Sequence, residues 1–252
     1  MIAVAVIPAR YASTRLAGKP LADLLGKPMI RRVHERVAAS GFFSDVIVAT
    51  DDERIAACVR GFGGKVAMAS PDHPSGTDRV AEAARDVRAD VVLNVQGDEP
   101  LIPRAVLAAA LAPFEKTPMP AMTTVATRFG SLAEYLSPNQ GKVVVDRRFR
   151  ALYFSRAPIP FDPVAGADGH GGKIPAAAYK TIGIYGYRKD FLETFTRLAP
   201  TPLERTERLE QLRALEHGYE IVVGISEEGT IGVDTPEDLE RVRALLSREG
   251  NP

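Results

Sequence analysis

The sequence predicts an α/β fold built on a Rossmann-like, mostly parallel sheet with helices on both faces. Four apolar, β-branched runs are typical of buried strands, and amphipathic stretches separate the first of them. These runs cover residues 4–8, 45–50, 65–69 and 90–95. Strands that alternate with helices are joined by right-handed crossovers, so this order predicts a parallel sheet.

The alternation of strands and helices breaks between about residues 130 and 190. Two strand-like runs, 142–146 and 150–154, flank a tight turn and predict a β-hairpin, and residues 179–187 predict a further strand. We interpret this stretch as an antiparallel excursion within one domain that spans residues 1–252. We expect it to form a cap over the ligand edge of the sheet and the surface of a homodimer.

The composition favours a small-molecule ligand over nucleic acid. Of the 252 residues, 45% are hydrophobic and 25% are charged, which is usual for a globular protein. The 32 basic and 32 acidic residues give zero net charge, whereas binding to a nucleic-acid backbone relies on excess positive charge. One lone cysteine, Cys58, and the lack of any run of roughly 18 apolar residues predict a cytoplasmic protein without stable membrane association. Four scattered histidines disfavour a zinc site.

The loop after the first strand carries cations and small residues. It contains Ala9, Arg10, Ser13, Arg15 and Lys19. In an open α/β sheet, ligands bind beyond the carboxyl ends of the strands, and such a loop suits a phosphate-rich ligand there. It matches neither GxGxxG nor GxxxxGK[ST]. The alternative is a solvated basic loop.

A second loop, residues 70–79, leads into a predicted helix. Thr77 or Asp78 is the predicted cap of that helix, whose start points main-chain donors toward an anion or a base edge. The alternative is a helix cap with no ligand.

A third candidate follows the strand at 90–95. Asp98 lies just beyond it and next to a glycine, where α/β enzymes hold Mg²⁺ for a nucleotide. We expect the neighbouring Glu99 to point the other way along the chain. The alternative for Asp98 is a turn-forming residue.

The C-terminal part returns to helices and a strand. Residues 202–218 predict one amphipathic helix, and residues 221–225 predict a last strand. Asp234 is a candidate second carboxylate for the metal. Its alternative role, shared with Thr235, is to cap the helix that Pro236 opens.

Several motifs resemble those of the 3-deoxy-manno-octulosonate (Kdo) cytidylyltransferases, and together they span residues 4–239. They are PARYASTRLAGKP at 8–20, SGTDR at 75–79, NVQGDEP at 94–100, YFSRAPIP at 153–160, LEQLR at 209–213 and VDTPEDL at 233–239. The resemblance implies a nucleotide-diphospho-sugar transferase-like fold. It implies a homodimer that uses CTP and Mg²⁺ to convert Kdo into CMP-Kdo and pyrophosphate for lipopolysaccharide biosynthesis.

The resemblance also implies roles for single residues. The implied nucleotide ligands are Ala9, Arg10, Ser13, Arg15, Lys19, Ser75, Gly76, Thr77 and Gln96. The implied sugar ligands are Gln96, Arg156, Tyr185, Glu210 and Gln211. The implied metal ligands are Asp98 and Asp234, and these act in catalysis together with Arg10 and Lys19. The alternative for Arg156 is a solvated edge-strand arginine. Spacing alone makes Glu210 and Gln211 solvated helix positions.

One position departs from the family pattern. Thr181 stands where relatives usually have a histidine, which leaves open a related acidic sugar, such as 8-amino-Kdo or a sialic acid. A non-catalytic nucleotide-binding module is a further alternative. The missing GxGxxG disfavours a nicotinamide dehydrogenase. No residue stands out as a general base.

Overall fold

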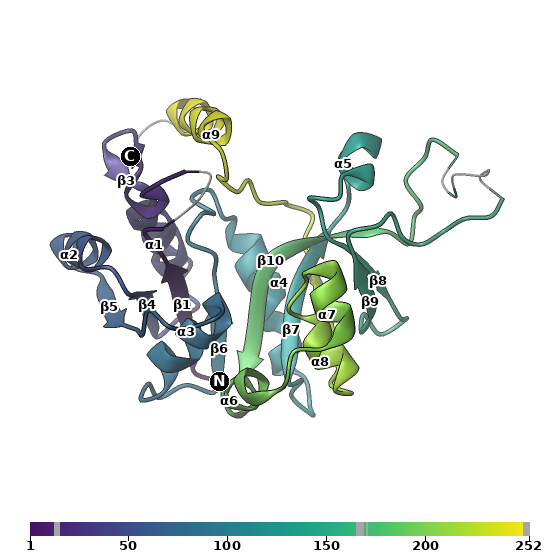
Figure 1. The fold of residues 1–252 in the computed structure, drawn as a ribbon, viewed down its shortest axis with the longest axis horizontal. Helices are drawn as coiled ribbons and strands as arrows, with labels where there is room; N and C mark the ends of the chain where they lie inside the picture. Colours follow the sequence, from purple (N-terminus) through teal and green to yellow (C-terminus); the bar gives the residue numbers. More distant parts are fainter. Residues whose placement is uncertain (13–15, 165–168, 170, 249–252) are drawn as a thin grey trace. The chain divides into compact units, whose positions relative to one another are not determined.

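A computed structural model describes residues 1–12, 16–164, 169 and 171–248. The chain divides into two compact units, Met1–Ala108 with Thr230–Pro252, and Ala109–Gly229 (Figure 1). Each unit is described by itself below. The expectation of one domain over 1–252 with a cap and dimer surface stays a prediction.

The first unit contains four parallel strands. They are β1 (Ala3–Ala9), β4 (Asp45–Thr50), β5 (Lys65–Met68) and β6 (Val91–Asn94), in the order β6-β1-β4-β5. Val6 on the central strand pairs with Ile47 on one side and Asn94 on the other. The apolar run of β1 is continuous, as in strands buried on both faces, and residues 4–7 are completely buried. The predicted parallel sheet is confirmed.

Three helices of the first unit, α1 (Met29–Ala39), α2 (Glu53–Gly61) and α3 (Gly76–Ala84), pack on this sheet. The unit also contains the 3-10 turn η1 (Lys19–Leu21), the short strands β2 (Asp23–Leu24) and β3 (Lys27–Pro28), and α9 (Pro236–Arg248), which packs against Leu24 and Met29. Asp52 caps α2, because its side chain accepts a hydrogen bond from the main-chain N–H of Arg54. Val33 and Val37 of α1 and Ile55 of α2 are fully buried. The helices thus supply the apolar cover that the sheet requires.

The second unit is mixed. Its strands are β7 (Met122–Thr127), β8 (Lys142–Val145), β9 (Ala151–Ser155), β10 (Tyr179–Arg188) and β11 (Ile221–Ile225). Strand β7 pairs with β11 in parallel and with β10 antiparallel, and β8 and β9 form the predicted hairpin. Its helices are α5 (Leu132–Leu136), α6 (Lys189–Arg197), α7 (Pro202–Glu207) and α8 (Leu212–Glu216). Helix α4 (Arg104–Leu111) contains the residue at which the first segment of the first unit ends along the chain, and the 3-10 turn η2 (Ala112–Glu115) belongs to the second unit.

The predicted continuous helix over 202–218 is wrong. The chain forms α7 and α8 instead, and Arg208 between them has the left-handed conformation, with φ 53° and ψ 47°. A non-glycine residue with positive φ ends a right-handed helix. The Arg208 carbonyl accepts a hydrogen bond from the side chain of Arg156, which is distant in the sequence. The periodicity of the apolar residues could not reveal a break that depends on such a contact.

Within the described ranges, no helix has both the length and the apolar character needed to cross a membrane.

Gly224 on β11 provides a test of packing in the second unit. A Cβ atom there would lie 2.0 Å from the carbonyl oxygen of Ala109. We therefore expect Gly224→Ala to lower the free energy of unfolding by about 2 kcal/mol, as overpacked sites do. Urea denaturation measures this change. Gly61→Ala is the matched control, since a Cβ at Gly61 meets nothing within 4 Å; equal stability of the two variants would contradict the prediction.

Candidate active site

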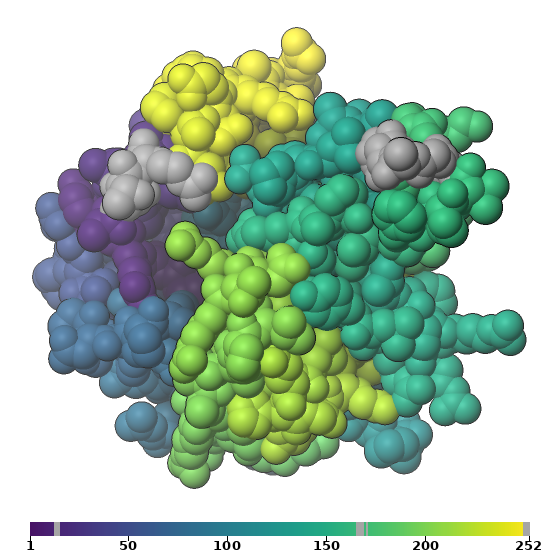
Figure 2. All heavy atoms as spheres, turned by 45° about the vertical axis from the view of Figure 1, so that its right-hand side comes forward, coloured from purple at the N-terminus to yellow at the C-terminus, as the bar shows by residue number. Residues whose placement is uncertain are grey.

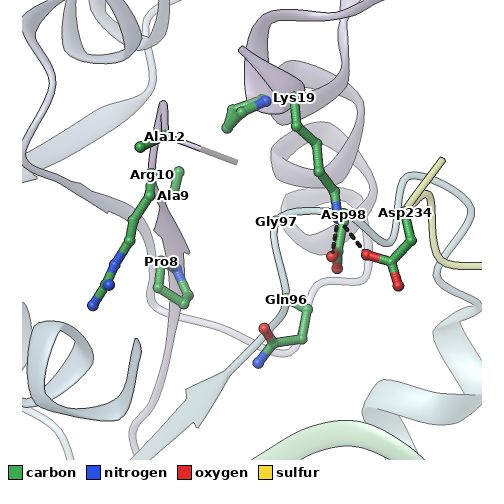
Figure 3. A pocket seen from close by; sticks show the side chains of 10 residues that line it. Pro8, Ala9, Arg10, Ala12, Lys19, Gln96, Gly97, Asp98 and Asp234 are labelled. Atoms are coloured by element: carbon green, nitrogen blue, oxygen red, sulfur yellow. Dashed lines mark hydrogen bonds and ion pairs between the residues drawn. The ribbon is translucent and has the colours of Figure 1, made fainter. Parts of the chain in front are cut away.

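A pocket of about 400 Å³ lies in the first unit, at the carboxyl ends of β1 and β6 (Figure 3). It is lined by Pro8, Ala9, Arg10, Ala12, Lys19, Pro20, Gln96, Gly97, Asp98 and Asp234. The structure thus brings together most of the residues predicted from the loops after the first and fourth strands, and adds Asp234 from the C-terminal segment. Ser13 and Arg15, predicted to bind the nucleotide, lie outside the described residues.

Lys19 lies between two carboxylates in this pocket. Its Nζ donates to Asp98 Oδ2 at 2.5 Å and to Asp234 Oδ1 at 3.0 Å (Figure 3). Burial by itself lowers the pKa of Lys19, but the charges and hydrogen bonds of the two aspartates outweigh burial and raise it. The ammonium is therefore charged at neutral pH. The side chain of Lys19 is 14% exposed and those of the aspartates are 31% and 47% exposed, so the carboxylates remain accessible to a ligand.

Local contacts of the main chain place the two aspartates. Val233 N donates to the carbonyl of Asp98 at 2.9 Å, which joins the segment before α9 to the turn after β6. Thr235 caps α9, since its Oγ1 accepts from the main-chain N–H of Asp238 at 3.2 Å. Thr235 therefore caps the helix, and the carboxylate of the neighbouring Asp234 faces Lys19. A metal-binding role for Asp234 stays a prediction.

A close approach of β1 and the turn after β6 shapes the floor of the pocket. A Cβ atom on Gly97 would lie 3.0 Å from the carbonyl oxygen of Pro8. Such a contact is tighter than real side chains usually allow, so a glycine at this position lets the turn lie against β1. Gln96 and Asp98 on either side of Gly97 both line the pocket.

Glu99 points away from the pocket and is buried, as expected. Its Oε1 accepts from Thr230 Oγ1 at 3.1 Å, and 8% of the residue is exposed. Burial, reinforced by the charge of Asp98, raises the pKa of Glu99 to about 8. Glu99 is therefore mostly neutral at pH 7 and does not add a third negative charge beside Asp98 and Asp234.

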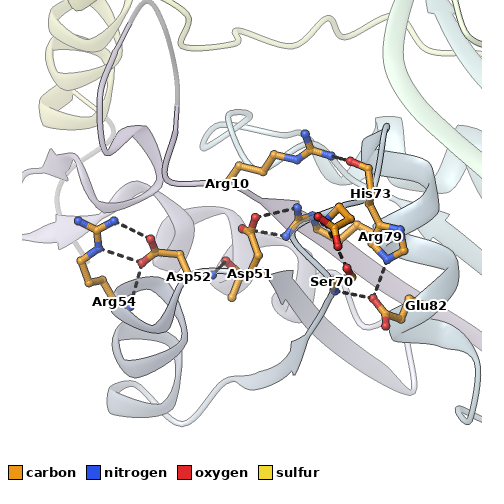
Figure 4. Close-up of polar contacts among 10 residues, drawn as sticks. Arg10, Asp51, Asp52, Arg54, Ser70, His73, Arg79 and Glu82 are labelled. Atoms are coloured by element: carbon orange, nitrogen blue, oxygen red, sulfur yellow. Dashed lines mark hydrogen bonds and ion pairs between the residues drawn. The ribbon is translucent and has the colours of Figure 1, made fainter.

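Arg10 borders the pocket and contacts the loop before α3. Its Nη2 donates to the carbonyl of His73 at 2.9 Å (Figure 4). The imidazole of His73 in turn lies 2.6 Å from Glu82 Oε2, which also accepts from the main chain of Ser70 at 2.8 Å. Glu82 thus holds the loop at Ser70 and at His73, and the main-chain carbonyl of His73 faces Arg10.

The predicted nucleotide ligands at the start of α3 do not line the pocket. Ser75 caps the helix, because its Oγ accepts from Asp78 N at 3.2 Å and its own N–H donates to Asp78 Oδ2 at 3.1 Å. Thr77 is 3% exposed. A Cβ on Gly76 would lie 3.8 Å from Pro8, so the helix begins beside the end of β1. The helix is thus capped by Ser75 and not by Thr77 or Asp78 as predicted, because Asp78 lies three residues further on and completes the capping box. A nucleotide-binding role for these residues stays a prediction.

Tyr11 and Arg54 were missed by the sequence reasoning. The guanidinium of Arg54 lies 3.3 Å from the centroid of the Tyr11 ring, a cation–π contact. The carboxylate of Asp52 holds Arg54 in place, because it accepts hydrogen bonds from Arg54 Nε at 3.0 Å and from Arg54 Nη2 at 2.6 Å (Figure 4). The carbonyl of Tyr11 accepts from Gly18 N at 3.2 Å. The contact between Arg54 and Tyr11 therefore holds the loop after β1 at a point between Arg10 and Lys19.

Four of the five predicted sugar ligands, all except Gln96, lie in the second unit. Burial raises the pKa of Tyr185, the carboxylate of Glu210 raises it further, and the charge of Arg156 opposes the rise, so the three groups lie within electrostatic reach of one another. Gln211 is 3% exposed, and its Nε2 has no hydrogen-bond partner among the described residues. A solvated helix position at 211 is therefore wrong.

Comparison with known proteins decides the family. The family model for cytidylyltransferases matches residues 4–221. The 3-deoxy-manno-octulosonate cytidylyltransferase of Geobacter metallireducens is 51% identical, with 97% of each chain covered. That of Syntrophobacter fumaroxidans is 53% identical, with 98% of this chain and 97% of the relative covered. This chain belongs to the 3-deoxy-manno-octulosonate cytidylyltransferase family.

A solved structure agrees with this assignment. The structure of CMP:2-keto-3-deoxy-manno-octonic acid synthetase complexed with CTP superimposes with a TM-score of 0.91 at 44% identity, over 99% of this chain and 100% of that one. The predicted α/β fold of this cytidylyltransferase family is thereby confirmed.

Glu99 gives a testable dependence of stability on pH. Its carboxyl group binds a proton more tightly in the folded state, with a pKa of about 8, than in an unfolded chain, where its ordinary pKa is 4.5. Its contribution to the free energy of unfolding is therefore largest below about pH 4.5 and falls as the pH rises toward 8. Urea denaturation of wild type and Glu99→Gln between pH 5 and 8 measures it.

We expect the stability difference, wild type minus Glu99→Gln, to decrease steadily over this pH range. Glu53→Gln, at an exposed carboxylate in the same unit, is the control and should show a constant difference. A constant difference for Glu99→Gln would contradict the raised pKa.

Proposed function

We propose that this protein transfers CMP from CTP to Kdo, giving CMP-Kdo and pyrophosphate for lipopolysaccharide biosynthesis. The observation that carries the proposal is the convergence of Lys19, Asp98 and Asp234 in a pocket at the carboxyl ends of parallel strands. Relatives at 51% and 53% identity with this named activity, and the 44% identical structure with bound CTP, support it.

We assign the triphosphate of CTP to the cations around the first loop. Lys19 is held in its charged form, and Arg10 lines the same pocket. These charges offset the negative phosphates, and the small residues Ala9 and Ala12 let the main chain approach them. Ser13 and Arg15 belong to this proposal on sequence grounds. Gln96 lines the pocket and is assigned to both nucleotide and sugar.

The residues of the pocket fit a Mg²⁺ ion. Two carboxylates face one point, and Mg²⁺ typically takes one or two carboxylates and completes its shell with phosphate oxygens and water. Among the described residues, no three His, Cys, Asp or Glu side chains form a fuller metal cage. We assign Asp98 and Asp234 as the ligands. The ion, when bound, neutralises phosphate charge and lowers the pKa of the attacking hydroxyl.

In the reaction, the anomeric hydroxyl oxygen of Kdo forms a bond to the α-phosphorus of CTP. The bond from that phosphorus to the oxygen bridging to the β-phosphate breaks, and pyrophosphate leaves with its electron pair. The proton of that hydroxyl passes to solvent water, and we assign no side chain as the base. Transfers of this kind mainly require positioning and charge neutralisation, which Arg10, Lys19, Asp98 and Asp234 supply.

We assign the sugar acid to Arg156, Tyr185, Glu210 and Gln211 of the second unit. A planar guanidinium matches the geometry of a carboxylate, and the buried amide of Gln211 offers a donor for a hydroxyl group. A homodimer, with the excursion as its interface, and a cytoplasmic location remain part of the proposal.

The second candidate function is transfer of CMP to a related acidic sugar, and the observation that favours it is Thr181 in place of the usual histidine. A Cβ on Gly141 would lie 2.4 Å from Thr181 Oγ1, and Thr181 N donates to the Gly141 carbonyl at 3.0 Å. The short side chain at 181 thus packs against the main chain beside Lys142. To distinguish the two candidates, the rate of pyrophosphate release is measured in the presence of CTP and Mg²⁺ with Kdo, 8-amino-Kdo or N-acetylneuraminate as the sugar acid.

Fast release with Kdo alone supports the proposed function. Preference for another acid would support the second candidate. CTP binding without release with any acid would overturn both and favour a binding module.

The two aspartates provide a direct test of the active site. We expect Asp98→Asn and Asp234→Asn each to lower kcat by about 100-fold or more, because each removes a charge that the site places beside the reacting phosphate. Pyrophosphate release at saturating CTP measures kcat. Asp86→Asn, at an exposed carboxylate of the same unit, is the control. Near-normal turnover of Asp98→Asn with Mg²⁺ would show that the metal assignment is wrong.

The stack of Arg54 on Tyr11 predicts an effect on nucleotide binding. We expect Arg54→Ala to raise the KM for CTP by about fivefold with little change in kcat, which corresponds to the loss of about 1 kcal/mol of cation–π energy that orders the loop. Steady-state kinetics with varied CTP measure it. Arg60→Ala on the same helix is the matched control; an equal KM in both variants would rule out this role of Arg54.

A further inference from the structure

Arg156 follows β9 and is held by main-chain carbonyl groups. Its Nε donates to Glu207 at 2.8 Å, its Nη1 to Pro138 at 3.0 Å, and its Nη2 to Arg208 at 3.3 Å. Over the described ranges, no carboxylate lies within ion-pair distance of this guanidinium. Carbonyl oxygens carry only partial charge, so they fix the guanidinium without neutralising it. Its positive charge therefore stays available to an anion.

The carboxylate of Glu207 is directed at the strand that carries Arg156. Oε2 accepts from the main-chain N–H of Arg156 at 2.8 Å, and Oε1 accepts from Ser155 Oγ at 2.6 Å and from Tyr153 OH at 3.2 Å. Burial alone raises the pKa of Glu207, but these hydrogen bonds and the charge of Arg156 outweigh it and lower the pKa. Glu207 thus binds β9 through its carboxylate and the Arg156 side chain through its carbonyl.

The break between α7 and α8 also contributes to the binding of the Arg156 side chain. Arg208 adopts positive φ, which a residue with a Cβ rarely does, and its carbonyl accepts from Arg156 at 3.3 Å. A strained conformation persists where surrounding contacts fix it. In Figure 2 the segment of α7 and α8, coloured light green, lies at the surface of the second unit, and α7 has no buried residue. Core packing of α7 therefore does not account for the position of Glu207.

Lys142 fixes Arg156 from the other side. It is completely buried, and its Nζ donates to the carbonyls of Ser137 at 2.6 Å, Gln140 at 2.9 Å and Arg156 at 2.8 Å. Glu207 thus contacts both the main-chain N–H and the guanidinium of Arg156, and Lys142 fixes its main-chain carbonyl. Contacts with the described residues use three of the five N–H groups of the guanidinium, which leaves two for a ligand.

We propose that Glu207 is a positioning residue that presets the guanidinium of Arg156 as a receptor for the carboxylate of the sugar acid. This inference rests on the proposed function. A side chain held in its binding geometry before the ligand arrives loses less conformational entropy on binding, so the affinity for the sugar is higher. Glu207 itself touches no substrate. Its removal lets Arg156 adopt other rotamers and weakens binding of the sugar selectively.

Glu207→Gln tests the proposal, since it keeps the shape of the side chain and removes one acceptor and the charge. We expect the KM for Kdo to rise about tenfold, with the KM for CTP within twofold of wild type. Arg156→Ala should raise the KM for Kdo more strongly. The double variant should be no worse than Arg156→Ala alone, because Glu207 acts through Arg156. Pyrophosphate release and thermal unfolding are measured for each variant.

Glu193→Gln, at an exposed carboxylate of α6, is the matched control and should leave both KM values unchanged. Ser155→Ala removes a single donor to Glu207 and should raise the KM for Kdo by a smaller factor, which also tests the proposal if Glu207→Gln does not fold.

The outcomes separate this inference from the proposed function. An unchanged KM for Kdo in Glu207→Gln and Ser155→Ala, with a raised KM in Arg156→Ala, overturns the positioning role alone. Equal increases in both KM values together with lower thermal stability also overturn it, since they indicate a structural role. An unchanged KM for Kdo in Arg156→Ala overturns the assignment of the sugar site on which the inference rests.

Discussion

The ion pairs of Lys19 with Asp98 and Asp234 are the interaction on which the candidate active site depends. The two aspartates lie 79 and 215 positions along the chain from the lysine, on the turn after β6 and before α9. Two carboxylates repel each other unless a cation lies between them. The ammonium of Lys19 supplies that charge here and keeps both carboxylates at the mouth of the pocket, where a metal ion and phosphates would need them. The neutral state of buried Glu99 limits the negative charge to these two groups.

In the second unit, the cation of the proposed sugar site, Arg156, has a different kind of partner. Lys19 is balanced by carboxylates, whereas the guanidinium of Arg156 is fixed by carbonyl dipoles and keeps its charge. The nearby carboxylate of Glu207 binds the main chain instead of the guanidinium. The difference fits the roles proposed for the two cations: one holds an anionic cluster in place, and the other receives an anionic ligand.

Contacts between side chains also fix the loops that carry these groups. Arg54, itself fixed by Asp52, lies on the ring of Tyr11, and His73 with Glu82 holds the loop that contacts Arg10. Loops are the most mobile parts of a fold, so a site built on them needs such supports to keep its geometry. In this protein the supports are planar or charged groups that bring no polar atom into the pocket.

The sequence by itself determined the parallel sheet of the first unit, the hairpin of the second, and most pocket residues. Apolar runs such as that of β1 report burial directly, and Ala9, Arg10, Gln96 and Asp98 follow strands whose ends meet at one edge. Only the tertiary structure decided the rest: the break at Arg208, the stack of Arg54 on Tyr11, and the contacts of Glu207. Each of these depends on partners distant in sequence, which periodicity and capping patterns do not record. The function proposed for the site therefore begins in local sequence, while its geometry is set by long-range contacts.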